Sequence, residues 1–130
     1  MFGFFKKKTK EQQPEITILS EERKAELNVL ISKKEQELTE TTNTEELAKI
    51  YEELGLAYAE LKDEQAIQLL EESLNHKLTM GDGYKQLMSL YNAKRAEAAR
   101  NGDDAGIEKY MDKMDEMRQI AKKLTITGGK

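Results

Sequence analysis

Residues 51–74, YEELGLAYAELKDEQAIQLLEESL, decide the fold of this chain. Apolar side chains recur in them every three or four residues, which is the spacing of one face of an α-helix and not that of a strand. The pair Lys62-Asp63 interrupts the pattern, and the same spacing resumes directly after it. The stretch therefore predicts two helices joined by a very short turn, so that they lie antiparallel and side by side.

The helical spacing extends in both directions from this stretch. Ser20 and Asn43 are residues of the N-cap type, and each is followed by acidic residues that favour a first helical turn. Residues 81–83 (Gly-Asp-Gly) and 101–104 (Asn-Gly-Asp-Asp) are turn sequences that separate two further helices. We therefore predict an all-α protein of about five helices arranged in antiparallel hairpins.

Length and composition fit one small helical domain. The chain has 130 residues, of which 35% are charged and 38% are apolar, and it has no Cys. The absence of Cys excludes disulfides, a Cys-based zinc site and a thiol nucleophile. We predict three segments: a disordered apolar and basic segment at 1–15, a single helical domain at 16–124 and a flexible tail at 125–130.

Charge is distributed unevenly along the chain. The formal net charge is −4, but the first ten residues hold four Lys and no acidic residue, so the rest of the chain is more acidic. An acidic body is a poor match to a phosphate backbone, and we predict no nucleic-acid partner. No stretch has the roughly 20 apolar residues of a transmembrane helix, and no secretory signal is present, so we expect a cytoplasmic protein.

The quoted stretch is partly repeated further along the chain. Its landmarks are an aromatic residue, Leu-Gly, a Tyr, a small residue and a large apolar residue. In the first copy these are Tyr51, Leu54, Gly55, Tyr58, Ala66 and Leu70. In the second copy the matching residues are Tyr84, Leu87, Tyr91 and Tyr110. The second copy departs in two ways, because Met88 replaces the Gly and the hairpin is about two helical turns longer.

This pattern, over residues 44–124, resembles the tetratricopeptide repeat. The resemblance implies an α-α superhelix in which tyrosines fill the gap between the two helices of a hairpin and small residues let the backbones approach. The chain also looks like small tetratricopeptide proteins of Gram-positive bacteria, some of them labelled fibronectin-binding-like. A generic helical bundle is the alternative interpretation. Two repeats are fewer than the three or so that a stable stack needs, so either the helix after Ser20 or a homodimer supplies the missing neighbour.

The resemblance also implies a binding face. In this family the first helix of each repeat lines a groove that holds a peptide. On this chain the main groove positions are Lys49, Glu52, Leu56, Lys85, Ser89 and Asn92. Further positions on the same face are Ala59, Glu60 and Asp82. Leu56 and Ser89 stand where a well-known subgroup has the Asn residues that clamp a C-terminal carboxylate, so such a ligand is not expected. The alternative is that all these are ordinary solvated helix positions.

Residues 1–10 suggest a second mode of action. Three Phe residues precede or flank a Lys cluster in MFGFFKKK. Aromatic side chains can enter a membrane interface, and each Lys adds about 1 kcal/mol on an anionic leaflet. The alternative function is therefore a membrane-surface accessory or fibronectin-binding-like protein, placed at the inner face of the membrane by weak contact. Incidental apolar residues in a disordered tail are the simpler interpretation.

Signals for catalysis or metal binding are weak. Asn101, Asp103, Gly106 and Asp112 fall on calcium-loop spacing, but a turn and a helix cap explain them better. His76 is the single His, and the sequence favours a helix-end role for it. No phosphate-binding Gly loop and no nucleophile–base pair is evident. We therefore predict a non-catalytic protein–protein interaction module, with no enzyme activity, cofactor or metal, that binds a peptide or protein partner.

Overall fold

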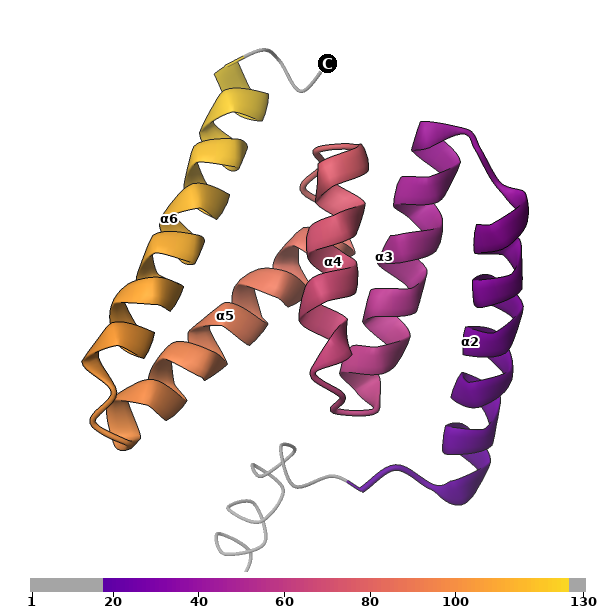
Figure 1. Cartoon of the computed structure of the whole chain (residues 1–130), viewed down its shortest axis with the longest axis horizontal. Coiled ribbons are helices and arrows are strands. Elements are labelled where there is room, and N and C mark those ends of the chain that lie inside the picture. The colour runs from indigo at the N-terminus through magenta and orange to yellow at the C-terminus, as the bar shows by residue number, and fades with distance from the viewer. Residues whose placement is uncertain (1–17, 127–130) are drawn as a thin grey trace, which may run out of the picture.

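Figure 1 shows a computed structural model of the chain, which describes residues 18–126. The described residues form five helices and no strand: α2 (Glu21–Glu40), α3 (Thr44–Glu60), α4 (Gln65–His76), α5 (Asp82–Arg100) and α6 (Asp104–Ile126). This confirms the all-α prediction. The predicted tail begins too early, because α6 continues through residues 125 and 126. The segment predicted at 1–15 lies outside the described residues.

Local side-chain caps set where three of the helices begin. The Ser20 hydroxyl accepts the N–H of Arg23 at 3.0 Å, and the Asn43 side chain accepts the N–H of Glu46 at 3.0 Å. Asp103 accepts the N–H of Gly106 at 3.0 Å ahead of α6. Each cap satisfies a backbone donor that has no partner within its own helix, which fixes the first turn.

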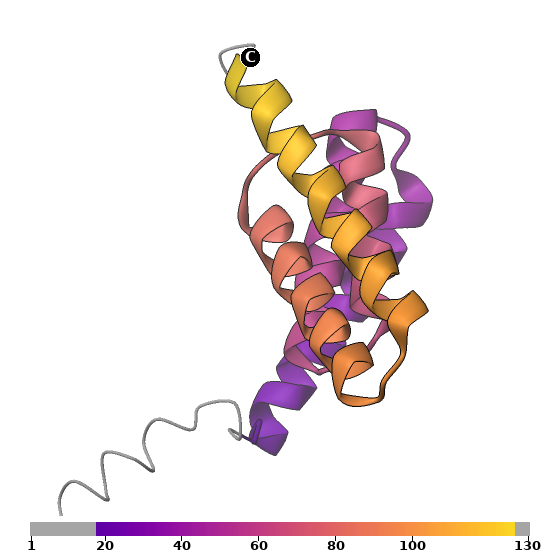
Figure 2. The same ribbon diagram turned by 90° about the vertical axis from the view of Figure 1, so that its left-hand side faces the viewer.

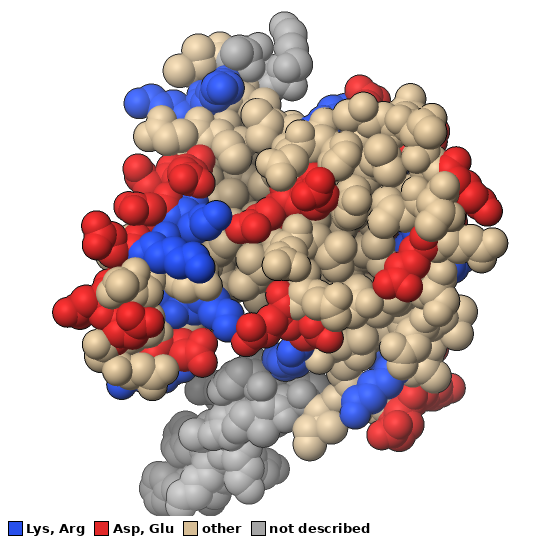
Figure 3. Space-filling view, in the orientation of Figure 1, with Lys and Arg blue, Asp and Glu red and all other residues tan. Residues whose placement is uncertain are grey.

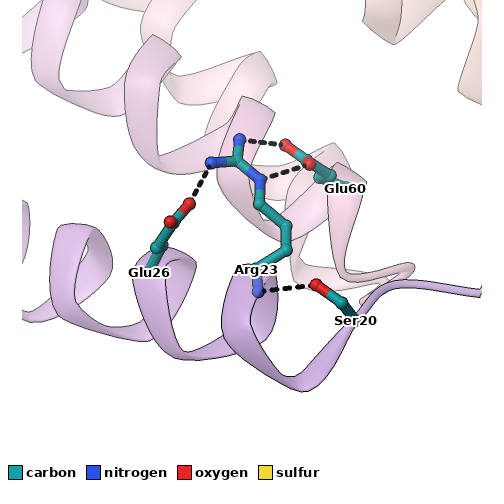
Figure 4. A network of polar contacts seen from close by, with 4 residues as sticks. All are labelled: Ser20, Arg23, Glu26 and Glu60. Atoms are coloured by element: carbon teal, nitrogen blue, oxygen red, sulfur yellow. Dashed lines mark hydrogen bonds and ion pairs between the residues drawn. The ribbon is translucent and has the colours of Figure 1, made fainter.

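The helix α2 lies at the edge of the molecule, antiparallel to α3 (Figure 1). Figure 4 shows how its first turn is fastened: the Arg23 guanidinium donates to both carboxylate oxygens of Glu60, at 2.7 and 2.9 Å, and to Glu26 at 3.0 Å. This contact raises the pKa of Arg23 and lowers that of Glu60. At the other end of the pair, Lys34 lies 2.7 Å from Glu53. The helix after Ser20 therefore supplies a neighbour for the repeat.

The apolar core consists of two clusters. The first joins α2 to α3 and is built from Leu27, Ile31, Ile50, Leu54 and Ala57. The second joins α4, α5 and α6 and is built from Leu70, Leu74, Leu87, Tyr91 and Met117. Leu56 of α3 packs against the second cluster, and so it connects the first hairpin to α5.

The helices α3 and α4 approach each other closely at Gly55. A Cβ atom added there would lie 2.6 Å from Cγ and Cδ2 of Leu70, which is 1% exposed. Two turns away, the buried Ser73 hydroxyl donates to the Ala48 carbonyl at 2.7 Å. Small residues therefore do allow the two backbones to approach, as the sequence predicts for this hairpin.

The tyrosines differ in which helix they contact. Within their own hairpins, Tyr51 stacks on His76 at a centroid distance of 5.3 Å, and Tyr84 donates to the Met117 carbonyl at 2.7 Å. Tyr58 instead packs against the α2–α3 cluster and donates to Glu35 of α2 at 3.2 Å. Tyr91 donates to Glu71 of the preceding hairpin and also lies 6.1 Å from the ring of Tyr110. The prediction that these tyrosines fill the gap within their own hairpin is therefore wrong for Tyr58 and only partly right for Tyr91.

Candidate functional site

The two central residues of the predicted groove are used by the fold itself. The Glu52 carboxylate accepts the N–H of Gly83 at 2.7 Å, and so α3 caps the N-terminus of α5. Gly81, at the N-cap position of α5, has no side chain that could do this. Leu56, one turn after Glu52, is partly buried against the second cluster. The helix α5 therefore lies against α3 at these residues, and this contact engages both side chains.

The other predicted positions line two depressions or are exposed on α5. Lys49 and Glu52 line a depression of about 430 Å³ near the start of α3, together with Lys77 and Thr79. Ala59 and Ser89 line a second depression, of about 650 Å³, between the end of the α3–α4 hairpin and α5. Asn92 is exposed and accepts a hydrogen bond from Arg95 at 3.1 Å. Lys85 is exposed on the outer surface of α5 and lines neither depression.

The second depression, hereafter the α3–α5 depression, combines an apolar lining with a charged rim. Its uncharged lining residues are Ala59, Ile67, Gln86, Ser89, Leu90 and Ala93. Its charged residues are Lys62, Asp63, Glu64, Lys94, Glu97 and Arg100. This composition matches the general pattern of an interaction site, in which an apolar centre is surrounded by polar residues.

One ion pair forms a boundary of the α3–α5 depression. Lys94 of α5 lies 2.7 Å from Glu64, which precedes α4, and 3.6 Å from Glu97. The hydrogen bond to Glu64 raises the pKa of Lys94. Glu64 remains 81% exposed at its side chain, so it is open to a second partner. The pair also links the residue before α4 to α5, at the edge of the apolar lining.

Ten of the twelve lining residues of the α3–α5 depression are not among the predicted groove positions, and Ile67, Leu90 and Ala93 are the apolar ones. Their spacing is that of ordinary helix positions. Ile67 lies in α4 and the other two lie in α5, so only the packing between hairpins brings them together. No local signal in the sequence distinguishes them from core or surface residues.

A further trough lies between α4 and α6. A depression of about 420 Å³ there is lined by Glu71, Lys109, Tyr110 and Lys113, among others. Its charges are already engaged, because Lys113 lies 3.5 Å from Glu71 and Lys109 lies 5.2 Å from the centre of the Tyr110 ring. On the face drawn in Figure 3, acidic and basic side chains are interspersed over α6. This trough is a less apolar site than the α3–α5 depression.

The residues weighed for metal binding have structural roles in the described chain. Asp103 caps α6, as above, and within residues 18–126 no group of three or more His, Asp or Glu side chains is placed to hold a metal ion. His76 stacks on Tyr51, and its Nδ1 lies 2.9 Å from the Glu72 carbonyl oxygen. None of the described helices is long and apolar enough to cross a membrane.

Comparisons with known proteins gave no match to a protein-family model, to a curated protein or to a solved structure. The tetratricopeptide resemblance, including its narrower Gram-positive and fibronectin-binding-like form, therefore stays a prediction from the sequence pattern.

Proposed function

We propose that this protein is a non-catalytic interaction module of tetratricopeptide-like type that binds a polypeptide at the α3–α5 depression. A cytoplasmic location is part of the proposal. The ligand is a short segment that inserts one or two apolar side chains between Ala59, Leu90 and Ala93, flanked by charged side chains of both signs. The predicted groove residues Ala59 and Ser89 belong to this site. Glu52 and Leu56 contribute to the site indirectly, because their contacts position α5 against α3.

One observation carries the proposal: the largest of the depressions described above is also lined by four apolar residues. Ala59, Ile67, Leu90 and Ala93 come from three different helices and line one depression of about 650 Å³. A recess of this size fits side chains of a peptide, whereas a rim with three acidic and three basic residues gives no preference for a polyanion. Apolar area removed from water would supply the affinity, and the rim would supply specificity.

The alternative function, contact with a membrane or with fibronectin through residues 1–10, concerns residues outside the described structure. Flotation with vesicles that contain anionic lipid separates it from the peptide-binding proposal. A membrane accessory should float, and replacement of Lys6, Lys7 and Lys8 by Ser should abolish flotation, because surface attraction scales with the number of basic residues. The peptide-binding proposal expects such changes to leave the α3–α5 depression intact.

The proposal is tested with peptides selected from a random 12-residue library on the immobilised full chain. Ala93→Arg places a long charged side chain in the depression and should weaken the selected peptides at least about tenfold, the equivalent of 1.4 kcal/mol. Ala99→Arg is the matched control, because Ala99 is exposed on the same helix and does not line the depression. Equal affinity of both variants would remove the α3–α5 depression as the site.

A further inference from the structure

The chain enters the described structure next to the α3–α5 depression. Leu19 packs against the first cluster together with Leu61, which directly precedes the rim residue Lys62. The contact between Arg23 and Glu60 fixes this entry point to the end of α3. Figure 1 shows the described chain beginning below the α3–α4 turn, and Figure 2 shows the same starting point on the side of α5. Residue 18 is thus held near the end of the molecule where the depression lies.

We infer that residues 1–10 of the same chain occupy the α3–α5 depression and compete there with an external ligand. This inference rests on the proposed function, because it assigns regulation to the same site. The segment carries Phe2, Phe4 and Phe5, which are all the Phe residues of the chain. These are the apolar side chains that the lining of Ile67, Leu90 and Ala93 would accept.

The stretch that joins residues 1–10 to the described structure is long enough for them to reach the depression. From Phe5 to Ile18 the chain can extend to roughly 45 Å, at about 3.3–3.6 Å per residue. A tether of this length gives an effective concentration in the millimolar range. Even a weak contact, with a dissociation constant near 1 mM, would then be formed a large part of the time.

Charge is compatible with the same occupant but does not select it, because the rim has three acidic and three basic residues. The first ten residues hold four Lys and no acidic residue, whereas the rim offers Asp63, Glu64 and Glu97. The Glu64 and Glu97 side chains are 81% and 54% exposed, so they can accept further basic partners. Because the rim also contains Lys62, Lys94 and Arg100, we expect the Phe residues to supply most of the affinity. The lysines then orient the segment.

The test uses the full chain. Because this chain has no Cys, the substitution Thr9→Cys introduces a single site for a spin label. The label should broaden the amide signals of Ile67, Ser89 and Ala93 selectively in ¹⁵N spectra. Replacing Phe2, Phe4 and Phe5 by Ser should remove this selectivity and tighten library-selected peptides about threefold or more, because the competitor is lost. A control mixes spin-labelled chain at natural ¹⁴N abundance with ¹⁵N chain that carries no spin label. This mixture should give no such broadening if the contact is within one chain.

The outcomes separate the inference from the proposed function. Broadening that is uniform, or that is unchanged by the three Phe replacements, would overturn the inference and leave peptide binding untouched. Selective broadening in the full chain, combined with selected peptides that ignore Ala93→Arg, would uphold the contact of residues 1–10 with the depression but overturn both the competition and the proposed function. Broadening in the mixed sample would overturn the contact within one chain and show that copies exchange this segment.

Discussion

The carboxylate of Glu52 in α3 accepts the backbone N–H of Gly83 in α5 at 2.7 Å. This contact caps α5 from another helix, because the N-cap position of α5 is a Gly with no side-chain acceptor, and it is one of several links between the two hairpins. The space is tight as well, since a Cβ atom added at Gly83 would lie 2.8 Å from the Glu52 side chain. The pair therefore fixes how the first turn of α5 lies against α3, the helix that also contributes Ala59 to the α3–α5 depression.

Glu52→Ala should therefore destabilise the protein by about 1 kcal/mol, the typical value of a lost helix cap. Glu52→Gln keeps an oxygen that can accept the Gly83 N–H and should lose less. Urea unfolding followed by circular dichroism measures both. Glu45→Ala, which removes a carboxylate that is 73% exposed in the same helix, is the control and should change stability by less than about 0.5 kcal/mol. An equal loss of stability in Glu45→Ala and Glu52→Ala would contradict a stabilising cap of α5 by Glu52.

Gly55→Ala tests the close approach of α3 and α4. The added methyl group would lie 2.6 Å from Leu70, a side chain with almost no exposed surface, so the helices must move apart. Overpacking typically costs about 1–3 kcal/mol, and the higher helix propensity of Ala offsets up to about 1 kcal/mol of this. We expect a net loss in the free energy of unfolding. Gly81→Ala, where the nearest atom is 3.6 Å away, meets no close contact and should lose only the N-cap preference for Gly over Ala, below about 1 kcal/mol. A stabilising Gly55→Ala would contradict the packing described here.

Tyr58→Ala should cost about 2 kcal/mol, which is less than the roughly 3–5 kcal/mol of a fully buried aromatic residue. Tyr58 is only partly buried, and its ring covers the α2–α3 cluster instead of the α3–α4 interface. Hydrogen exchange should show increased opening of α2 in particular. Tyr58→Phe keeps the ring and loses only the hydrogen bond to Glu35, so it should cost less than about 1 kcal/mol. Increased hydrogen exchange confined to α4 would contradict the assignment of Tyr58 to the α2–α3 cluster.

Tyr91 predicts how stability depends on alkaline pH. Burial, followed by the hydrogen bond to Glu71, raises the pKa of Tyr91 above its ordinary value of 10.0. The folded state therefore holds the phenol proton more tightly than the unfolded state. This contribution is fully present below about pH 10 and is lost as the pH rises from there toward the folded pKa. Tyr91→Phe should flatten the loss of stability above pH 10 in unfolding experiments. An identical pH profile in wild type and variant would contradict this assignment.

Local sequence signals predicted most of the fold. Ser20, Asn43 and Asp103 cap helices where their side chains are expected to do so, because capping depends on residues three positions apart. The requirement for Gly at position 55 could also be anticipated from the repeat pattern, since the contact lies within one hairpin. The end of α6 was placed two residues early because helix ends carry weaker signals.

The candidate site was harder to predict because it depends on contacts between hairpins. Glu52 has the composition of a solvated helix position, and nothing near it in the sequence indicates that its partner is Gly83. The same is true of Tyr91, whose partner Glu71 lies in the preceding hairpin. For the same reason, Leu90 and Ala93 enter the site from positions that look like ordinary helix residues.

The central claim, that polypeptide ligands bind at the α3–α5 depression, is tested most directly by titrating the ¹⁵N-labelled full chain with the tightest library-selected peptide. The account predicts that the largest chemical-shift changes cluster at Ala59, Ile67, Leu90 and Ala93 and saturate with the dissociation constant measured independently. Changes concentrated instead at Tyr110 and Lys113 in the trough between α4 and α6, or along the outer surface of α2, would contradict it.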